Sequence, residues 1–321
     1  MSLFYLKKWY FDLVTPGGDA IYSYFIIGRI AGFGLGLAST HLRYASGEQV
    51  RASVRTGFAV PDARGNLSLG RHSFIRNEDR ADVRLVFENI TLDLCYATVF
   101  GGWRPTGGGL LWNRGKRFLL WEVVQSLAEV KGTITAASGK FSISGVGYQD
   151  IVETSIPPWK LPIAELIWGR AHCGGHVVVF NQVRTREGEV LQSLLLGQPS
   201  SHLRAEIEAS KTEGFPPAPG WSLDSDQNFS YIRDDNDREA AVVHRDFRLA
   251  LSHPAVLEES PIVTAERFRS RISRRIFNGA CGRPLELKML SAADLEIKGI
   301  HHRGWAIHER VTWNWPQKEP E

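Results

Sequence analysis

The sequence predicts a mainly β protein, built as a barrel or a sandwich. Apolar and polar residues alternate along many short segments, as strands with one buried face require. Glycine-rich and proline-rich turns separate these segments, and few stretches have helical periodicity. At 321 residues the chain is long enough for two domains, and 43% apolar with 23% charged residues is typical of a globular protein.

Strands and turns alternate through the first half of the chain. The apolar stretch 20–38 contains Arg29 and four glycines, which disfavours a membrane-spanning helix and favours two strands joined near Gly32. Alternation over 90–96 predicts another strand. Three further strand segments are 118–127, 130–135 and 140–148, and the last two are separated by a Ser-Gly turn that predicts a hairpin.

Two irregular stretches interrupt the first half. Residues 101–109 read Gly-Gly-Trp-Arg-Pro-Thr-Gly-Gly-Gly, which predicts either a plain connection or a mobile lid with Trp103 at its tip. Residues 156–162 contain three prolines that break regular pairing, so we interpret them as the inter-domain connection. The predicted domains are therefore 1–156 and 163–321.

The second half repeats this pattern. Strands are predicted at 176–183, 190–196 and 240–251, a break at 215–220, and a solvated charged turn at 233–239. One or two short helices are expected, at 200–211 and 265–277. The second of these is rich in arginine, which indicates a solvated face or an anion-binding surface; a strand pair there is an alternative.

The final segment is the clearest strand. One of its faces carries, in order, Trp305, Ile307, Glu309, Val311, Trp313 and Trp315. A carboxylate on an apolar face must pair, hydrogen-bond or take up a proton. Glu309 is therefore expected either to form a structural pair with an arginine or to act as a catalytic acid with a raised pKa.

Two short motifs lie near the middle of the chain. Residues 145–150 read Gly-Val-Gly-Tyr-Gln-Asp, and residues 168–170 read Trp-Gly-Arg. The glycines allow the backbone to bend or to approach a neighbour closely. Tyr148 and Asp150 share one face of any strand, so a phenol and a carboxylate could form an acid–base site there. Alternatively, Asp150 stabilises the inter-domain connection by hydrogen bonds.

These motifs resemble those of the twin-lipocalin family, which includes carotenoid 1,2-hydratases, AttH-type proteins and natural-product cyclases such as decalin-forming Diels–Alderases. The resemblance covers nearly the whole chain in pattern. It implies two lipocalin-like β-barrels or half-barrels packed side by side, with the first motif near their junction and the second opening the second barrel. Hydratase-like members often read Tyr-His-Asp-His-Asn where this chain reads Tyr148-Gln149-Asp150-Ile151-Val152, which weakens the case for hydration.

Ten tryptophans and sixteen phenylalanines are many for this length. Each could simply pack in a β core, or several could line an apolar ligand cavity. The tryptophans proposed to bind substrate, together with Arg170, are Trp103, Trp112, Trp121, Trp168 and Trp305. Asp150, Tyr148 and Glu309 are the candidate catalytic residues, because each can move one proton.

The leading functional hypothesis is a cofactor-independent cyclase or isomerase of secondary metabolism, with a hydrophobic polyene, terpenoid or polyketide-like substrate. The alternatives are hydration of a C=C bond in a carotenoid or terpenoid, and binding of an apolar ligand without catalysis. Nucleotide motifs are missing, and His172 and His176 could share a strand face but lack a third ligand, so no cofactor and no metal are expected.

The expected partner is a hydrophobic small molecule. A net charge of +3 gives no case for nucleic acid, and no integral membrane segment or signal peptide is expected. Three scattered cysteines, Cys95, Cys173 and Cys281, favour the reducing cytoplasm. The oligomeric state cannot be predicted from these features.

Overall fold

The computed structural model describes residues 3–77, 79–105, 109–199, 221–226, 228–236, 238–262 and 282–314. The chain divides into two compact units, and the division falls between Pro157 and Pro158. A short 3-10 helix, Pro158–Lys160, begins at this point. The predicted domain limits lie on either side of it, and the independence of the two domains stays a prediction.

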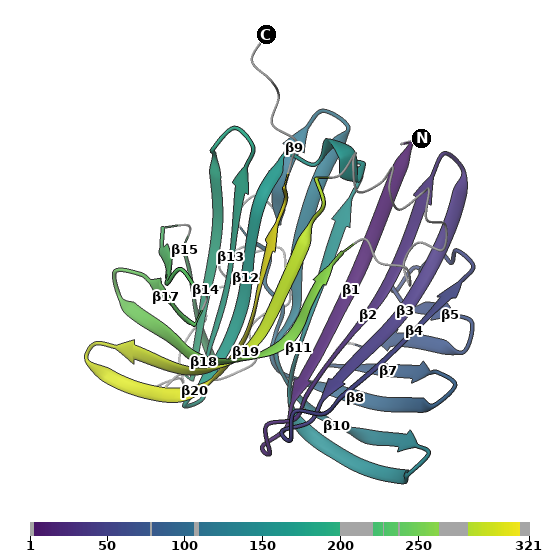
Figure 1. Ribbon diagram of the computed structural model, residues 1–321, viewed down its shortest axis with the longest axis horizontal. Coiled ribbons are helices and arrows are strands. Elements are labelled where there is room, and N and C mark those ends of the chain that lie inside the picture. The colour runs from purple at the N-terminus through teal and green to yellow at the C-terminus, as the bar shows by residue number, and fades with distance from the viewer. Residues whose placement is uncertain are drawn as a thin grey trace. The chain divides into compact units, whose positions relative to one another are not determined.

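Eleven of the described strands form one antiparallel sheet, the first sheet, in the first unit (Figure 1). They are β1 (Phe4–Val14), β2 (Ala20–Ile30), β3 (Phe33–Arg43), β4 (Gln49–Thr56), β5 (Leu67–Leu69), β6 (His72–Arg76), β7 (Arg80–Val86), β8 (Ile90–Phe100), β9 (Leu110–Arg114), β10 (Arg117–Ala136) and β11 (Gly139–Thr154). Their order is β4-β3-β2-β1-β11-β10-β8-β7-β6-β5, and β9 pairs with β10. Most strands therefore lie beside their neighbours in sequence, as in up-and-down barrels.

Nine further described strands form the second sheet, in the second unit. They are β12 (Ile163–Cys173), β13 (His176–Thr185), β14 (Val190–Pro199), β15 (Trp221–Asp226), β16 (Ser230–Arg233), β17 (Glu239–Val243), β18 (Phe247–Pro261), β19 (Leu285–Ile297) and β20 (Ile300–Thr312). Their order is β15-β14-β13-β12-β20-β19-β18-β17-β16, and the sheet curves into a half-barrel. The all-β, lipocalin-like fold class predicted from the sequence is confirmed.

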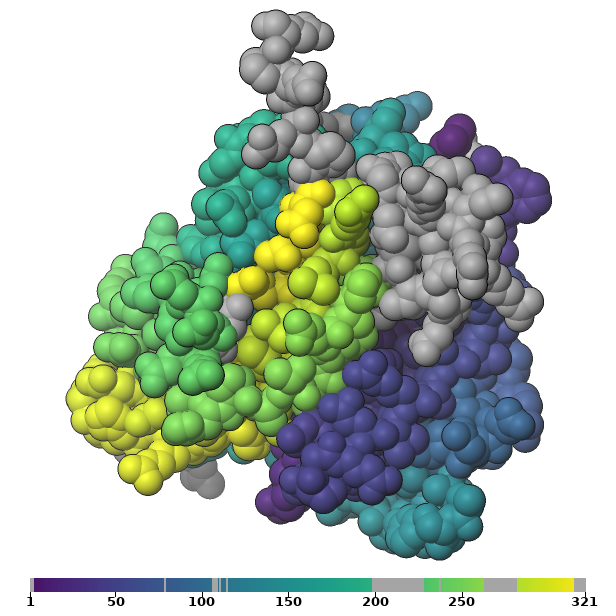
Figure 2. Space-filling view, viewed as in Figure 1, coloured from purple at the N-terminus to yellow at the C-terminus, as the bar shows by residue number. Residues whose placement is uncertain are grey.

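Each sheet packs one face onto a core of its own unit. In the first sheet, Phe11 and Phe25 belong to this core. In the second sheet, Phe180 and Leu295 do so. Because side chains alternate along a strand, the intervening residues lie on the opposite face of each sheet. Figure 2 shows the turn between β19 and β20 at the surface, and Ile300 beside this turn is 62% exposed.

Several local predictions can be compared with these strands. The stretch 20–38 forms β2 and the start of β3, joined at Gly32, and Ala136 pairs with Gly139 in the predicted β10–β11 hairpin. The single strand predicted at 240–251 is wrong. A polar turn interrupts it, where the backbone N–H of His244 donates to the Phe247 carbonyl over 3.0 Å.

Some predictions fall outside the described residues. They are the two helices, the break at 215–220, Cys281 and Trp315. Within the described part of the chain, no helix has the length and apolar composition needed to cross a membrane.

Candidate functional site

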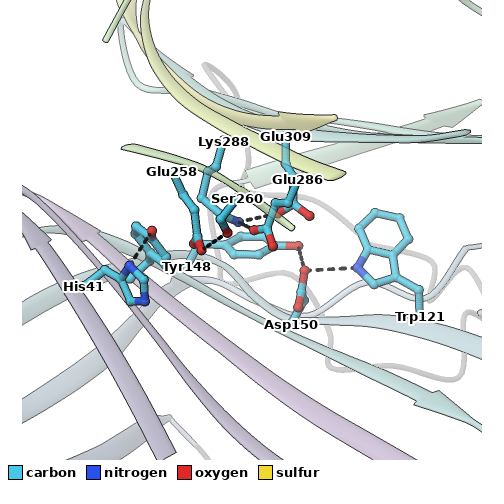
Figure 3. A network of polar contacts seen from close by, with 10 residues as sticks. His41, Trp121, Tyr148, Asp150, Glu258, Ser260, Glu286, Lys288 and Glu309 are labelled. Carbon is cyan, nitrogen blue, oxygen red and sulfur yellow. Dashed lines mark hydrogen bonds and ion pairs between the residues drawn. The ribbon is translucent and has the colours of Figure 1, made fainter. Parts of the chain in front are cut away.

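Asp150 and Tyr148 lie on the face of the first sheet that is opposite the core. Asp150 accepts two hydrogen bonds on Oδ2, from the Tyr148 hydroxyl and from the Trp121 indole N–H, each over 3.1 Å (Figure 3). Asp150 is 5% exposed and Tyr148 is fully buried. Two donors aimed at one oxygen hold the Asp150 carboxyl group in a single orientation.

The glycines of the motif allow this arrangement. β11 pairs with β1 so that Tyr148 lies opposite Asp12, and the neighbouring backbones are close. A Cβ atom on Gly147 would lie 2.4 Å from a Val130 methyl carbon and 2.7 Å from the Asp12 carbonyl oxygen. Any side chain at position 147 would therefore push the strands apart and move Tyr148.

A cluster of tyrosines continues this face across β1 and β2. The ring centroids of Tyr10 and Tyr24 are 5.4 Å apart, and those of Tyr10 and Tyr148 are 6.2 Å apart. Both Tyr10 and Tyr24 are buried. These residues were not among the predicted site residues. Tyr22 and Tyr24 alternate with Ser23 in the predicted strand region 20–38, whereas no strand was predicted around Tyr10.

The three candidate tryptophans of the first unit lie around strand β10. Trp103 and Trp121 form an edge-to-face pair with centroids 5.6 Å apart. Trp103 is only 4% exposed and its backbone pairs with Val123, so the prediction of Trp103 as the tip of a lid is wrong. The backbone bridge to Val123 keeps Trp103 beside strand β10. Trp112 is half-buried on β9, opposite Leu119.

The second sheet carries a buried polar row on the face opposite its core. The register places Glu258, Lys288, Glu309, Trp168 and Asn181 directly opposite one another on β18, β19, β20, β12 and β13. All five are at most 9% exposed. Cross-strand neighbours on one face contact each other, so the row is continuous over five strands.

Glu309 forms an ion pair with Lys288. The expectation that an arginine would be its structural partner is therefore wrong, because the register of the β19–β20 hairpin places a lysine opposite it. The Lys288 ammonium also lies 3.6 Å from Glu286 and 5.5 Å from the centroid of Trp168. Lys288 was not among the residues predicted to form the site.

Further carboxylates surround this lysine. Glu258 lies opposite Lys288 and accepts a hydrogen bond from the Ser260 hydroxyl over 2.7 Å (Figure 3). At the other end of the row, Asn181 Oδ1 has no hydrogen-bond partner among the described residues. The row thus combines proton-bearing groups with an acceptor that can bind a polar ligand atom.

Arg170 and Trp305 are also brought together on this face. The Arg170 guanidinium carbon lies 4.5 Å from the Trp305 ring centroid, and Arg170 is 1% exposed. Between Trp168 and Arg170, a Cβ atom on Gly169 would lie 2.3 Å from the Phe180 ring. The Trp-Gly-Arg segment thus carries both large side chains on one face while the glycine leaves room for Phe180 on the other.

The predicted histidine pair does not share a face. His172 and His176 flank the β12–β13 turn, and His176 pairs with Cys173, so His172 points to the other face. Burial lowers the pKa of both imidazoles. Across the described ranges, no cluster of three or more His, Cys, Asp or Glu side chains is arranged to hold a metal ion.

Two surface pockets are distinct from these buried faces. One of about 660 Å³, in the first unit, is lined by residues that include Arg51, Arg71 and His72. One of about 440 Å³, in the second unit, is lined by residues that include Gln192 and His244. Neither is lined by a tryptophan that the sequence predicts to bind substrate. These tryptophans therefore remain candidate ligand contacts by prediction alone.

Searches of protein-family models and of curated protein sequences find no match to the chain. Solved structures do match. A putative AttH from Nitrosomonas europaea superposes with a TM-score of 0.60 at 15% identity, covering 97% of this chain and 93% of its own. CghA, solved with Sch210972, has a TM-score of 0.61 at 12% identity, and the match covers 96% of this chain and 88% of CghA. Kievitone hydratase from Nectria haematococca has a TM-score of 0.54 at 11% identity, and the match covers 96% of this chain and 89% of the hydratase.

Identities this low establish the fold and not the activity. The three matches extend over nearly all of this chain and most of each relative. The chain therefore has the fold of the twin-lipocalin proteins that the motifs at 145–150 and 168–170 predicted.

Proposed function

We propose that the protein is a cofactor-independent cyclase or isomerase that acts on a hydrophobic polyene, terpenoid or polyketide-like substrate in secondary metabolism. The observation that supports this most is the buried carboxylate of Asp150, which accepts hydrogen bonds from Tyr148 and Trp121. A buried ionisable group that is held in one orientation by two donors is typical of a catalytic acid or base.

Three properties of this face suit such a reaction. Asp150 can accept a proton from a substrate atom or orient a polar substrate group, and the Tyr148 hydroxyl lies within hydrogen-bond reach of it. The rings of Trp121, Tyr10 and Tyr24 can hold a polyene in a folded shape and stabilise developing positive charge. Exclusion of water, in turn, prevents hydrolysis of reactive intermediates.

The polar row of the second sheet supplies a second acid–base candidate. Glu309 shares its ion pair with Lys288, and Trp168 lies beside it on β12. For a substrate bound at the second sheet, the proposed roles are proton transfer by Glu309, whose carboxylate Lys288 holds in place, and substrate contact by Trp168, Arg170 and Trp305.

Hydration of a C=C bond is the second candidate. The motif positions that differ from hydratase-like sequences include Gln149 and Ile151, and both side chains lie on the core face, away from Asp150. The third difference, Val152 in place of asparagine, lies on the same face as Tyr148 and Asp150, so this face lacks one polar group of the hydratase-like pattern. The similarity of the fold to kievitone hydratase is compatible with this reaction.

One experiment separates the alternatives. Purified protein is incubated with a panel of hydrophobic polyenes in H₂¹⁸O, and the products are analysed by chromatography and mass spectrometry. A product of unchanged mass supports cyclisation or isomerisation. A product that is heavier by one labelled water indicates hydration instead. Tight binding without any product indicates a binding protein and contradicts the proposal.

A further inference from the structure

A row of titratable side chains crosses four strands of the first sheet. The register places His41 of β3 opposite Tyr22 of β2, Tyr22 opposite Asp12 of β1, and Asp12 opposite Tyr148 of β11. Residues directly opposite one another share a face. His41 and Tyr22 therefore lie on the same face as Asp150, which is two residues from Tyr148 on β11.

The Tyr22 hydroxyl and His41 form a hydrogen-bonded pair. The distance from Tyr22 Oη to His41 Nδ1 is 2.8 Å, and the two rings stack with centroids 4.7 Å apart (Figure 3 shows His41). Tyr22 is 1% exposed, whereas His41 is only half-buried. A proton can therefore pass between the phenol and the imidazole, and the imidazole can exchange it with solvent.

We infer that Tyr22 is a second proton-transferring catalytic residue, with His41 as its positioning and proton-exchanging partner. This inference rests on the proposed function and deepens it. β2 and β11 are each one strand away from β1, so the backbones of Tyr22 and Tyr148 are about 10 Å apart at the usual strand spacing. The two groups therefore serve substrate atoms that are several bonds apart.

This spacing points to a substrate class. Carboxylates and phenols are weak bases, so the C–H bond they act on must be acidified by conjugation to a carbonyl group. The substrate is thus a conjugated polyene carbonyl compound, whose delocalised anion can lose a proton at one carbon and gain one at a distant carbon. The reaction is a migration of double bonds with no change in composition.

The proton balance is complete. The Asp150 carboxylate takes a proton from one substrate carbon, and the electron pair of that C–H bond enters the conjugated system. The Tyr22 hydroxyl gives its proton to the distant carbon while protonated His41 passes its Nδ1 proton to the Tyr22 oxygen. Asp150 then loses a proton to solvent and His41 regains one, which restores the starting state.

Deuterium exchange tests this assignment. Two conjugated polyene carbonyl compounds, β-ionone and all-trans-retinal, are incubated with the full-length protein in D₂O, and NMR locates the deuterium. We expect incorporation at two separated carbons. Tyr22→Phe should slow exchange at one carbon by about 10²-fold and leave the other within about twofold, because one positioned acid–base group is lost. Asp150→Asn should slow incorporation at both carbons, because Asp150 forms the delocalised anion that Tyr22 then protonates.

Thr40→Val is the matched control. Thr40 and Ser23 form a buried hydrogen bond of 2.9 Å between the same two strands, but on the core face. This variant removes a β2–β3 contact without touching the row, so it should leave exchange at both carbons unchanged. For His41→Gly, added imidazole should restore exchange at the carbon served by Tyr22, which a purely structural role of His41 would not allow.

The outcomes are distinguishable. If Tyr22→Phe leaves both carbons unaffected, or slows both equally, the assignment of Tyr22 is overturned and the proposed function stands. If the wild-type protein gives no exchange above buffer with either compound, the proposed function fails and the inference fails with it.

Discussion

Removing the Lys288 ammonium should strongly destabilise the second unit. Lys288 is 1% exposed, forms an ion pair with Glu309 and lies 3.6 Å from Glu286. Lys288→Met keeps the length of the side chain but leaves buried carboxylates without their cation. Breaking a buried ion pair in this way costs about 3–5 kcal/mol. For a unit of this size, that corresponds to a decrease in Tm of roughly 6–20 °C.

The assay is thermal unfolding followed by circular dichroism, with Arg84→Met as the matched control. Arg84 pairs with Asp93 across β7 and β8 over 3.2 Å, but the two side chains are 58% and 43% exposed. An exposed pair contributes about 0.2–1 kcal/mol, so the control should lower Tm by at most about 4 °C. Equal decreases in Tm for the two variants would show that burial does not make the Lys288 ion pair more important than an exposed one.

Three further predictions concern single residues. Burial lowers the pKa of His308 to about 4, so the unfolded chain takes up a proton that the folded chain does not as pH falls from about 6.5 to 4. His308 should therefore leave the unfolding free energy unchanged above pH 7 and lower it by about 3 kcal/mol between pH 7 and pH 4. In denaturant titrations, a His308→Gln variant should lack this loss. Burial raises the pKa of the Cys173 thiol to about 12. Iodoacetamide at pH 8 should therefore leave Cys173 unlabelled in peptide mass spectra until the protein unfolds. Rapid labelling of the native protein would contradict the burial of this thiol. Gly169→Ala places a Cβ atom 2.3 Å from the Phe180 ring and should lower the unfolding free energy by about 1–3 kcal/mol in denaturant titrations. Phe180→Leu should recover part of this loss. An unchanged unfolding midpoint for Gly169→Ala would show that the contact relaxes freely.

Several strands, among them β2, β8, β10 and β11, could be predicted from the sequence because burial of one face imposes alternation. The Gly-x-Gly-Tyr-x-Asp motif also predicted that Tyr148 and Asp150 share a face, since this depends only on the geometry of one strand. Their hydrogen bond of 3.1 Å agrees with that prediction.

Contacts between distant strands could not be predicted. The partner of Glu309 is 21 residues away and is selected by the register of β19 against β20. Trp103 is buried by a bridge to Val123 that nothing in the glycine-rich stretch 101–109 indicates. The Tyr22–His41 pair likewise depends on the register of β2 against β3, and apolar neighbours made each residue look like ordinary strand sequence.

The proposed function depends above all on Asp150, whose carboxylate transfers a proton or orients the substrate. Its most direct test is to measure turnover and Tm on one preparation of Asp150→Asn, with a polyene that the wild-type protein converts. Turnover is expected to fall by about 10²–10⁴-fold while most of the protein remains folded at the assay temperature. A lower Tm with unchanged turnover per folded molecule would contradict it, because Asp150 would then act only by stabilising the strands around it.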